Sequence, residues 1–129
     1  KKNLVLEEDA QKMDEIQEQL FLNKDAILEV CNQYFKLKKN LKILSLNSKE
    51  GRSMEKSLRT IYEILESAQI EVNDHTSQIF DAGLSLTVLA WEEHPDLTKN
   101  TIVETISPSI FFNQKLIQKG EVIVGKNSK

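Results

Sequence analysis

Apolar residues recur at every seventh position of the N-terminal half, and this spacing constrains the fold more than any other feature. One series runs from position 6 to position 41, a second lies three residues later, and ten of these twelve sites are apolar. Asp9 and Asn23 are the exceptions, and neither Gly nor Pro interrupts residues 3–46. A seam of about six heptads predicts one long helix, or two nearly collinear helices divided at residues 22–25.

A second helix is expected after a linker at residues 45–52, which is rich in turn formers, with Ser53 as its N-cap. Its apolar residues share one face: Met54, Leu58, Ile61, Tyr62, Leu65 and Ala68. The first stripe could pack on this helix of the same chain or on a second copy. Because the stripe is too long for this single intramolecular partner, we expect a homodimer with coiled-coil packing.

The period of the pattern changes at Ile70, where β-branched residues and alternating apolar positions begin. Strands are expected at residues 70–72, 84–91, 101–106, 110–112, 116–117 and 122–124, with a turn at residues 113–115. The predicted fold class is therefore α+β, with a long helix and a second helix followed by a small antiparallel β-domain. We place the domain boundary between residues 1–70 and residues 71–129.

Charge and composition exclude several classes of protein. The chain has 129 residues, and its 17 Lys and Arg against 20 Asp and Glu leave no basic excess for binding nucleic acid. No apolar run approaches the roughly 20 residues that cross a bilayer, so no membrane segment is expected. The single cysteine, Cys31, excludes an internal disulfide. We expect a cytoplasmic location and, because the chain begins with Lys1, a piece of a longer protein.

Residues that could carry chemistry are few. His75 and His94 each have carboxylates nearby in the sequence, so each could bind a metal or shuttle protons, or could be an ordinary loop histidine. No metalloprotease, phosphate-loop or dinucleotide motif is present. Trp91 could contact a partner or lie half-buried in a sheet. We therefore expect no enzyme activity, no metal and no cofactor, and we keep an enzyme using either histidine as a competing hypothesis.

Five segments, in this order and spacing, resemble the GrpE family, whose members are nucleotide exchange factors of DnaK-type heat-shock chaperones. The resemblance covers roughly residues 26–126. The segments are Ile27-Leu28-Glu29-Val30-Cys31-Asn32-Gln33-Tyr34, Gln69-Ile70-Glu71-Val72, Phe80-Asp81, Thr101-Ile102-Val103-Glu104, and Leu116-Ile117 with Val122-Ile123-Val124-Gly125-Lys126. They are similar to the family's first helix, the end of its second helix, its Phe-Asp-Pro motif and its later strands.

The resemblance implies a parallel dimer in which long helices pair as a stalk, shorter helices form a four-helix bundle and each β-domain projects as a wing. A wing would bind the ATPase domain of the chaperone and release ADP without covalent chemistry or a cofactor. The implied chaperone contacts are Glu92, Glu93, His94, Phe112, Asn113, Lys115 and Gln118. The implied dimer interface is Ile27, Val30, Tyr34, Leu37, Leu41, Leu58, Ile61, Tyr62 and Leu65.

The sequence departs from the family pattern within the β-half. The family's Phe-Asp-Pro-x-x-His-Glu-Ala-Val becomes Phe80-Asp81-Ala82-Gly83-Leu84-Ser85-Leu86-Thr87-Val88, and its Arg-Pro-Ala becomes Gln118-Lys119-Gly120. These changes support an alternative, in which the chain is a GrpE-fold dimeric interaction or scaffold module that has lost exchange activity.

Overall fold

The computed structural model describes residues 9–13, 15, 23–44 and 47–127, which fall into two compact units, Lys1–Val30 and Cys31–Lys129. In the first unit, residues 9–13 and 15 are helical. The sites of the apolar seam at positions 6, 16 and 20 lie outside the described residues, as do Ser45 and Leu46 of the predicted linker. Helix α2 begins at Lys24, one residue after Asn23.

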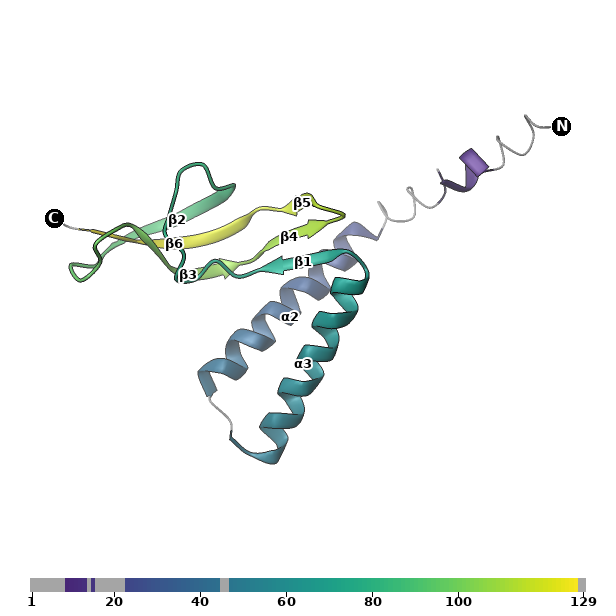
Figure 1. Cartoon of the computed structure of the whole chain (residues 1–129), viewed down its shortest axis with the longest axis horizontal. Coiled ribbons are helices and arrows are strands. Elements are labelled where there is room, and N and C mark those ends of the chain that lie inside the picture. The colour runs from purple at the N-terminus through teal and green to yellow at the C-terminus, as the bar shows by residue number, and fades with distance from the viewer. Residues whose placement is uncertain (1–8, 14, 16–22, 45–46, 128–129) are drawn as a thin grey trace. The chain divides into compact units, whose positions relative to one another are not determined.

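Two helices are described in full, α2 (Lys24–Leu44) and α3 (Lys49–Ser67), and the part of α2 from Cys31 onward lies beside α3 (Figure 1). The expected N-cap at Ser53 was wrong, because the helix starts five residues earlier than that cap implies. Ser48 is the N-cap, and its Oγ accepts a hydrogen bond from the backbone N–H of Gly51 at 3.1 Å. Gly51 is accommodated in the first turn, where Glu50 also favours the helix dipole. Neither helix carries an uncharged apolar stretch long enough to span a membrane.

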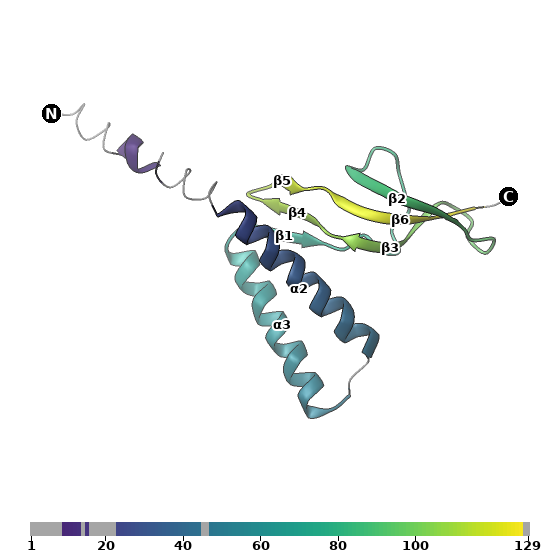
Figure 2. The ribbon, with the colours of Figure 1, turned by 180° about the vertical axis from the view of Figure 1, so that it is seen from behind.

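Six strands follow the helices and form two three-stranded sheets (Figures 1 and 2). Their order along the chain is β1 (Ile70–Asn73), β2 (Leu86–Glu93), β3 (Thr101–Ser107), β4 (Ser109–Phe112), β5 (Lys115–Gln118) and β6 (Gly120–Lys126). One sheet, here sheet A, has the order β1-β4-β5, and the other, sheet B, has the order β2-β6-β3. The α+β class predicted from the sequence is therefore confirmed.

The direction of one strand pair differs from the prediction. Sheet A is antiparallel throughout, whereas β6 runs parallel to β2 and antiparallel to β3 in sheet B. The expectation of a purely antiparallel β-domain was thus wrong for sheet B. Alternating apolar residues report that a segment is a strand with one buried face, but they do not encode the direction of its neighbour.

The register of β2 also breaks within the strand. The pairing with β6 shifts between Val88 and Ala90, so Leu89 has no partner there and Trp91 lies beside Val124. A residue inserted in this way reverses the alternation of the following side chains. Trp91 therefore lies on the same face as Val88, although the sequence pattern placed the two residues on opposite faces.

The core of sheet B consists of Ile102, Val122 and Val124, which are fully buried, with Phe80, Leu86 and Val88 packed against them. Gly120 marks a close approach beside this core. A Cβ atom at position 120 would lie 2.6 Å from Ser109 Oγ and 3.0 Å from Leu86 Cδ2. The backbone of β6 thus approaches β4 and β2 more closely than a side chain permits.

We predict that Gly120→Ala lowers the free energy of unfolding by about 1–3 kcal/mol, because the added methyl group forces its neighbours apart. Urea unfolding followed by circular dichroism measures this change. Gly83→Ala is the matched control, since a Cβ atom there would meet nothing closer than Asp81 Oδ1 at 3.5 Å. Equal unfolding midpoints for the two variants would contradict the packing argument.

Candidate functional site

Four of the implied chaperone contacts lie on the β4–β5 hairpin. Asn113 and Gln114 form its turn with φ values of 50° and 67°, and Phe112 pairs with Lys115 across it. Two consecutive residues of positive φ match the twist of a tight hairpin. The N–H of Asn113 also donates to the carbonyl of Gln69 at 2.9 Å, which ties the turn to the end of α3. Asn113 and Lys115 are exposed, and Phe112 is half-buried.

Gln118, the fourth residue on this hairpin, has a structural role that the sequence did not reveal. Its amide exchanges two hydrogen bonds of 2.9 Å with the amide of Asn32 on α2. Its Nε2 also donates to the carbonyl of Pro108 at 2.9 Å. We expected Gln118 to be an exposed contact residue, but it is half-buried and joins α2 to β5.

The remaining implied contacts, Glu92, Glu93 and His94, lie at the end of β2 in sheet B. His94 Nε2 lies 3.2 Å from Glu92 Oε1, and the backbone N–H of His94 donates to the carbonyl of Lys126. Both views of the chain place this end of β2 and the β4–β5 turn at opposite ends of the β-half (Figures 1 and 2). The seven implied contacts therefore form two separate groups.

A polar cluster around His75 joins the β1–β2 connection to β3 and β4. In the His75 side chain, Nε2 lies 2.7 Å from Ser109 Oγ, and Nδ1 lies 2.9 Å from Gln78 Oε1. The backbone N–H of His75 donates a hydrogen bond to Thr105 Oγ1. A histidine beside a serine hydroxyl is also the geometry of nucleophilic catalysis. Here Ser109 is only 2% exposed and the third partner is an amide, so a substrate has no approach to the hydroxyl.

Asp74 extends the same cluster. Its Oδ1 accepts hydrogen bonds from the N–H of Thr76 at 2.9 Å and from Thr76 Oγ1 at 2.7 Å. Partial burial alone would raise the pKa of Asp74, but hydrogen bonds from Thr76 and Thr105 and the charge of Lys42 outweigh it and lower the pKa. The carboxylate is thus ionised and stabilises the turn that presents His75.

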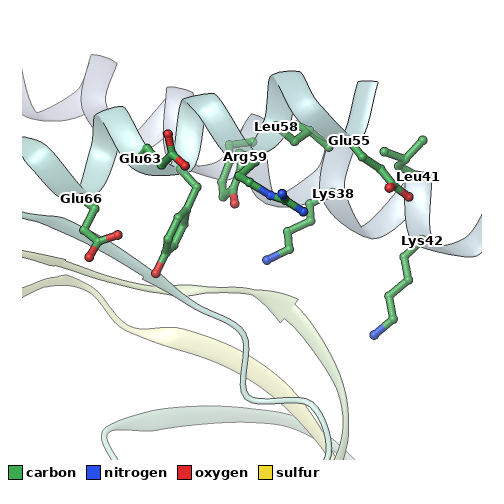
Figure 3. Close-up of a pocket in the computed structure, with 10 residues that line it drawn as sticks. Lys38, Leu41, Lys42, Glu55, Leu58, Arg59, Glu63 and Glu66 are labelled. Carbon is green, nitrogen blue, oxygen red and sulfur yellow. The ribbon is translucent and has the colours of Figure 1, made fainter. Parts of the chain in front are cut away.

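The two helices form a mixed-charge groove of about 650 Å³ (Figure 3). It is lined by Tyr34, Lys38, Leu41, Lys42, Glu55, Leu58, Arg59, Tyr62, Glu63 and Glu66. Lys38 Nζ lies 6.0 Å from the ring centroid of Tyr62. Burial raises the pKa of the Tyr34 hydroxyl, and the neighbouring Tyr62 raises it further. Helix α2 contributes Lys38 and Lys42 to this lining, and α3 contributes Arg59 together with three glutamates. The groove therefore carries charges of both signs and does not select an ion of one sign.

A second groove, which we call the apolar groove, has a volume of about 320 Å³ and is lined by Leu37, Leu41, Ser53, Met54, Ser57, Leu58 and Ile61. Four of the nine implied dimer residues line this groove: Leu37, Leu41, Leu58 and Ile61. Tyr34, Leu41 and Leu65 are buried, while Ile27, Leu58 and Ile61 are half-buried. Leu37, Val30 and Tyr62 are exposed, Leu37 to 56%.

The described residues include no cluster of three His, Cys, Asp or Glu side chains that could hold a metal ion. Cys31 is a buried free thiol, and burial raises its pKa, which disfavours the reactive thiolate. No protein-family model and no curated protein matches this chain. The candidate functional surfaces are therefore the β4–β5 turn, the end of β2 and the apolar groove.

We predict that Asn32→Ala and Gln118→Ala each lower the free energy of unfolding by about 1–3 kcal/mol, because each leaves a half-buried amide without its partner. The double variant should lose less than the sum of the two single losses. Urea unfolding of all four proteins gives the coupling energy. Asn40→Ala, at an exposed position of the same helix, is the matched control. Strict additivity would show that the amide pair contributes no coupling.

Proposed function

We propose that this chain is a GrpE-like co-chaperone, a nucleotide exchange factor that binds the ATPase domain of a DnaK-type chaperone and promotes release of ADP. The observation that carries this proposal is the order of parts, in which a helical hairpin with an apolar groove precedes six short strands. Two segments that resemble strands of the family lie on strands of this chain, Thr101-Ile102-Val103-Glu104 on β3 and Val122-Ile123-Val124-Gly125-Lys126 on β6.

The proposed assembly is a homodimer formed through the apolar groove. Leu37 and Leu44 on α2 are seven residues apart, as are Met54 and Ile61 on α3, so both pairs repeat with the coiled-coil period. Leu37, Leu44 and Met54 are exposed in the single chain, and Ile61 is half-buried. A second copy would remove these side chains from water, at a gain of roughly 25 cal/mol per Å² of apolar surface.

The proposed mechanism is a population shift of the chaperone. The chain would bind the open, nucleotide-free ATPase domain more tightly than the closed, ADP-filled one, so binding would lower the affinity for ADP. The exposed Asn113 and Lys115, with Phe112, form one contact group, and Glu92, Glu93 and His94 form another. No step makes or breaks a covalent bond, so the proposed function requires neither enzyme activity nor a cofactor. The proposed location is the cytoplasm.

A second candidate is a GrpE-fold interaction module without exchange activity. This candidate is favoured by the internal contacts of two residues that depart from the family pattern. Gln118 bonds to α2, and Gly120 packs tightly against Ser109, so both positions serve the internal packing of this chain. Residues that pack inside this chain cannot contact the chaperone and hold its nucleotide cleft open.

We predict that saturating amounts of this chain weaken binding of a fluorescent ADP analogue to its chaperone by about 5- to 150-fold, the usual range of coupling between sites. ADP should weaken binding of the chain by the same factor. Lys115→Glu should reduce the effect, and Lys56→Glu on α3 is the charge-matched control.

Two outcomes of this measurement separate the candidates. Tight binding with unchanged ADP affinity would exclude exchange and favour the interaction module. No binding to any DnaK-type chaperone encoded by the same genome would exclude the exchange function.

We predict that the chain is a dimer at tens of micromolar in sedimentation equilibrium. Leu37→Glu should weaken the dimer at least a hundredfold, since an unpaired charge in an apolar interface costs roughly 3–5 kcal/mol. Ile43→Glu is the matched control, because Ile43 lies on the same helix, is 72% exposed and lines neither groove. A monomeric wild type, or equal weakening by both variants, would exclude this interface.

A further inference from the structure

Sheet B has one protected edge and one open edge. On the β3 side, residues 77–80 pair with the strand: Ser77 N–H donates to the Ile102 carbonyl and Ile102 N–H to the Gln78 carbonyl, both at 2.8 Å. Phe80 N–H donates to the Asn100 carbonyl, and Ile79 forms a bridge to Thr101. The chain thus satisfies outer backbone groups at the start of β3 with a segment of its own.

The other edge of the same sheet is β2, which pairs only with β6. Within the described part of the chain, no hydrogen bond reaches the outer side of residues 87–93. Proteins usually protect such an edge with Pro, with charged side chains, with a β-bulge or with a very short strand. β2 is eight residues long and contains no Pro, its two glutamates stand at one end, and its bulge at Leu89 interrupts the edge at a single point. Its unpaired N–H and C=O groups form a template for another extended chain.

Large apolar side chains accompany this open edge. Leu89 and Trp91 of β2 are each 51% exposed, although both are large enough to fill a core. Trp91 meets Phe80 edge to face, with ring centroids 5.4 Å apart. The register shift at Leu89 brings Trp91 to the face of the sheet B core, so the indole and the Phe80 ring together form a partly open apolar surface beside the edge.

The charge at this edge indicates what kind of strand fits it. β2 ends in Glu92 and Glu93, and it contains no basic residue. Glu92 contacts His94, and no ion pair of Glu93 is found in the described part of the chain. A second copy would bring two more glutamates and no cation if its own β2 were the added strand. A peptide that carries Lys or Arg would instead complement the edge.

We propose that the outer edge of β2 is a strand-addition site for an extended, basic segment of a partner protein. The backbone of that segment would bond to residues 87–93, an apolar side chain would pack on Trp91 and Phe80, and a Lys or Arg would lie beside Glu92 and Glu93. This site goes beyond the proposed exchange function and does not depend on it, because it requires no nucleotide and no second copy.

The test uses a defined peptide, acetyl-Lys-Val-Lys-Val-Thr-Val-Lys-amide, added to the full chain. Two control peptides are used. In the first, Glu replaces each Lys. The second keeps the Lys residues but carries N-methyl groups at alternate residues, so its backbone cannot form strand hydrogen bonds. Trp91 is the single tryptophan of the chain, so its fluorescence reports binding at this edge directly. Amide hydrogen exchange then locates the bound peptide strand by strand.

We expect millimolar basic peptide to shift Trp91 emission to the blue and to slow exchange of β2 amides at least about tenfold. The Glu92→Lys/Glu93→Lys variant should weaken binding of the basic peptide at least about tenfold, and Glu63→Lys/Glu66→Lys, with the same charge change on α3, should not. The N-methylated peptide should leave both signals unchanged.

Four results would overturn the proposal. The first is unchanged exchange in β2 at millimolar basic peptide, and the second is slowing confined to other strands. The third is equal binding of the basic and acidic peptides. The fourth is slowing in β2 that depends on protein concentration without peptide, which would assign the edge to a second copy. The ADP-affinity measurement is independent of all four, so failure here leaves the proposed function standing.

Discussion

Helix α2 bonds to both sheets, and the arrangement of the β-half depends on this double attachment. Asn32 pairs with Gln118 on β5 of sheet A, while Lys39 Nζ lies 3.0 Å from Glu104 Oε1 and donates to the Thr105 carbonyl on β3 of sheet B. A sheet of a few short strands gains stability when it packs against a helix. The Lys39–Glu104 ion pair is partly exposed and contributes little energy. The amide pair and the bond to the carbonyl of buried Thr105 therefore fix the position of the helix.

This attachment changes how the departures from the GrpE pattern are interpreted. Gln118 and Gly120 stand where the family has Arg-Pro-Ala, and in this chain one joins a helix to a strand while the other allows β6 to approach Ser109. Internal packing thus occupies positions at which the proposed function would place a partner-binding surface. The exposed side chains left for a partner are at the β4–β5 turn, at the end of β2 and along the apolar groove.

The local features of the fold could be predicted from the sequence, and the long-range features could not. Seven-residue spacing predicted the first helix, a single apolar face predicted the second, and β-branched alternation predicted the strands, because each pattern reports which face of a single element is buried. The parallel pairing of β2 with β6 and the register shift at Leu89 depend on a strand some 30 residues away, which local patterns do not encode. The sequence pattern placed the N-cap at Ser53 because Ser53 directly precedes the apolar residue Met54, whereas the helix is capped at Ser48, before a first turn that contains no large apolar residue. The Asn32–Gln118 pair had no sequence signal, since it joins residues 86 positions apart.

The central place of β6 in sheet B has a consequence for the synthesis of the protein. β6 is the last strand of the described chain, yet β2 and β3 both pair with it and not with each other. While the chain emerges from the ribosome, the helical hairpin can form early, because its hydrogen bonds are local. β2 and β3 can form their strand pairs only after residues 120–126 have been synthesised, because both pair with β6. The nascent chain therefore passes through a stage in which the apolar residues of β2 are without a sheet, the stage at which a partner or a chaperone would meet them most readily.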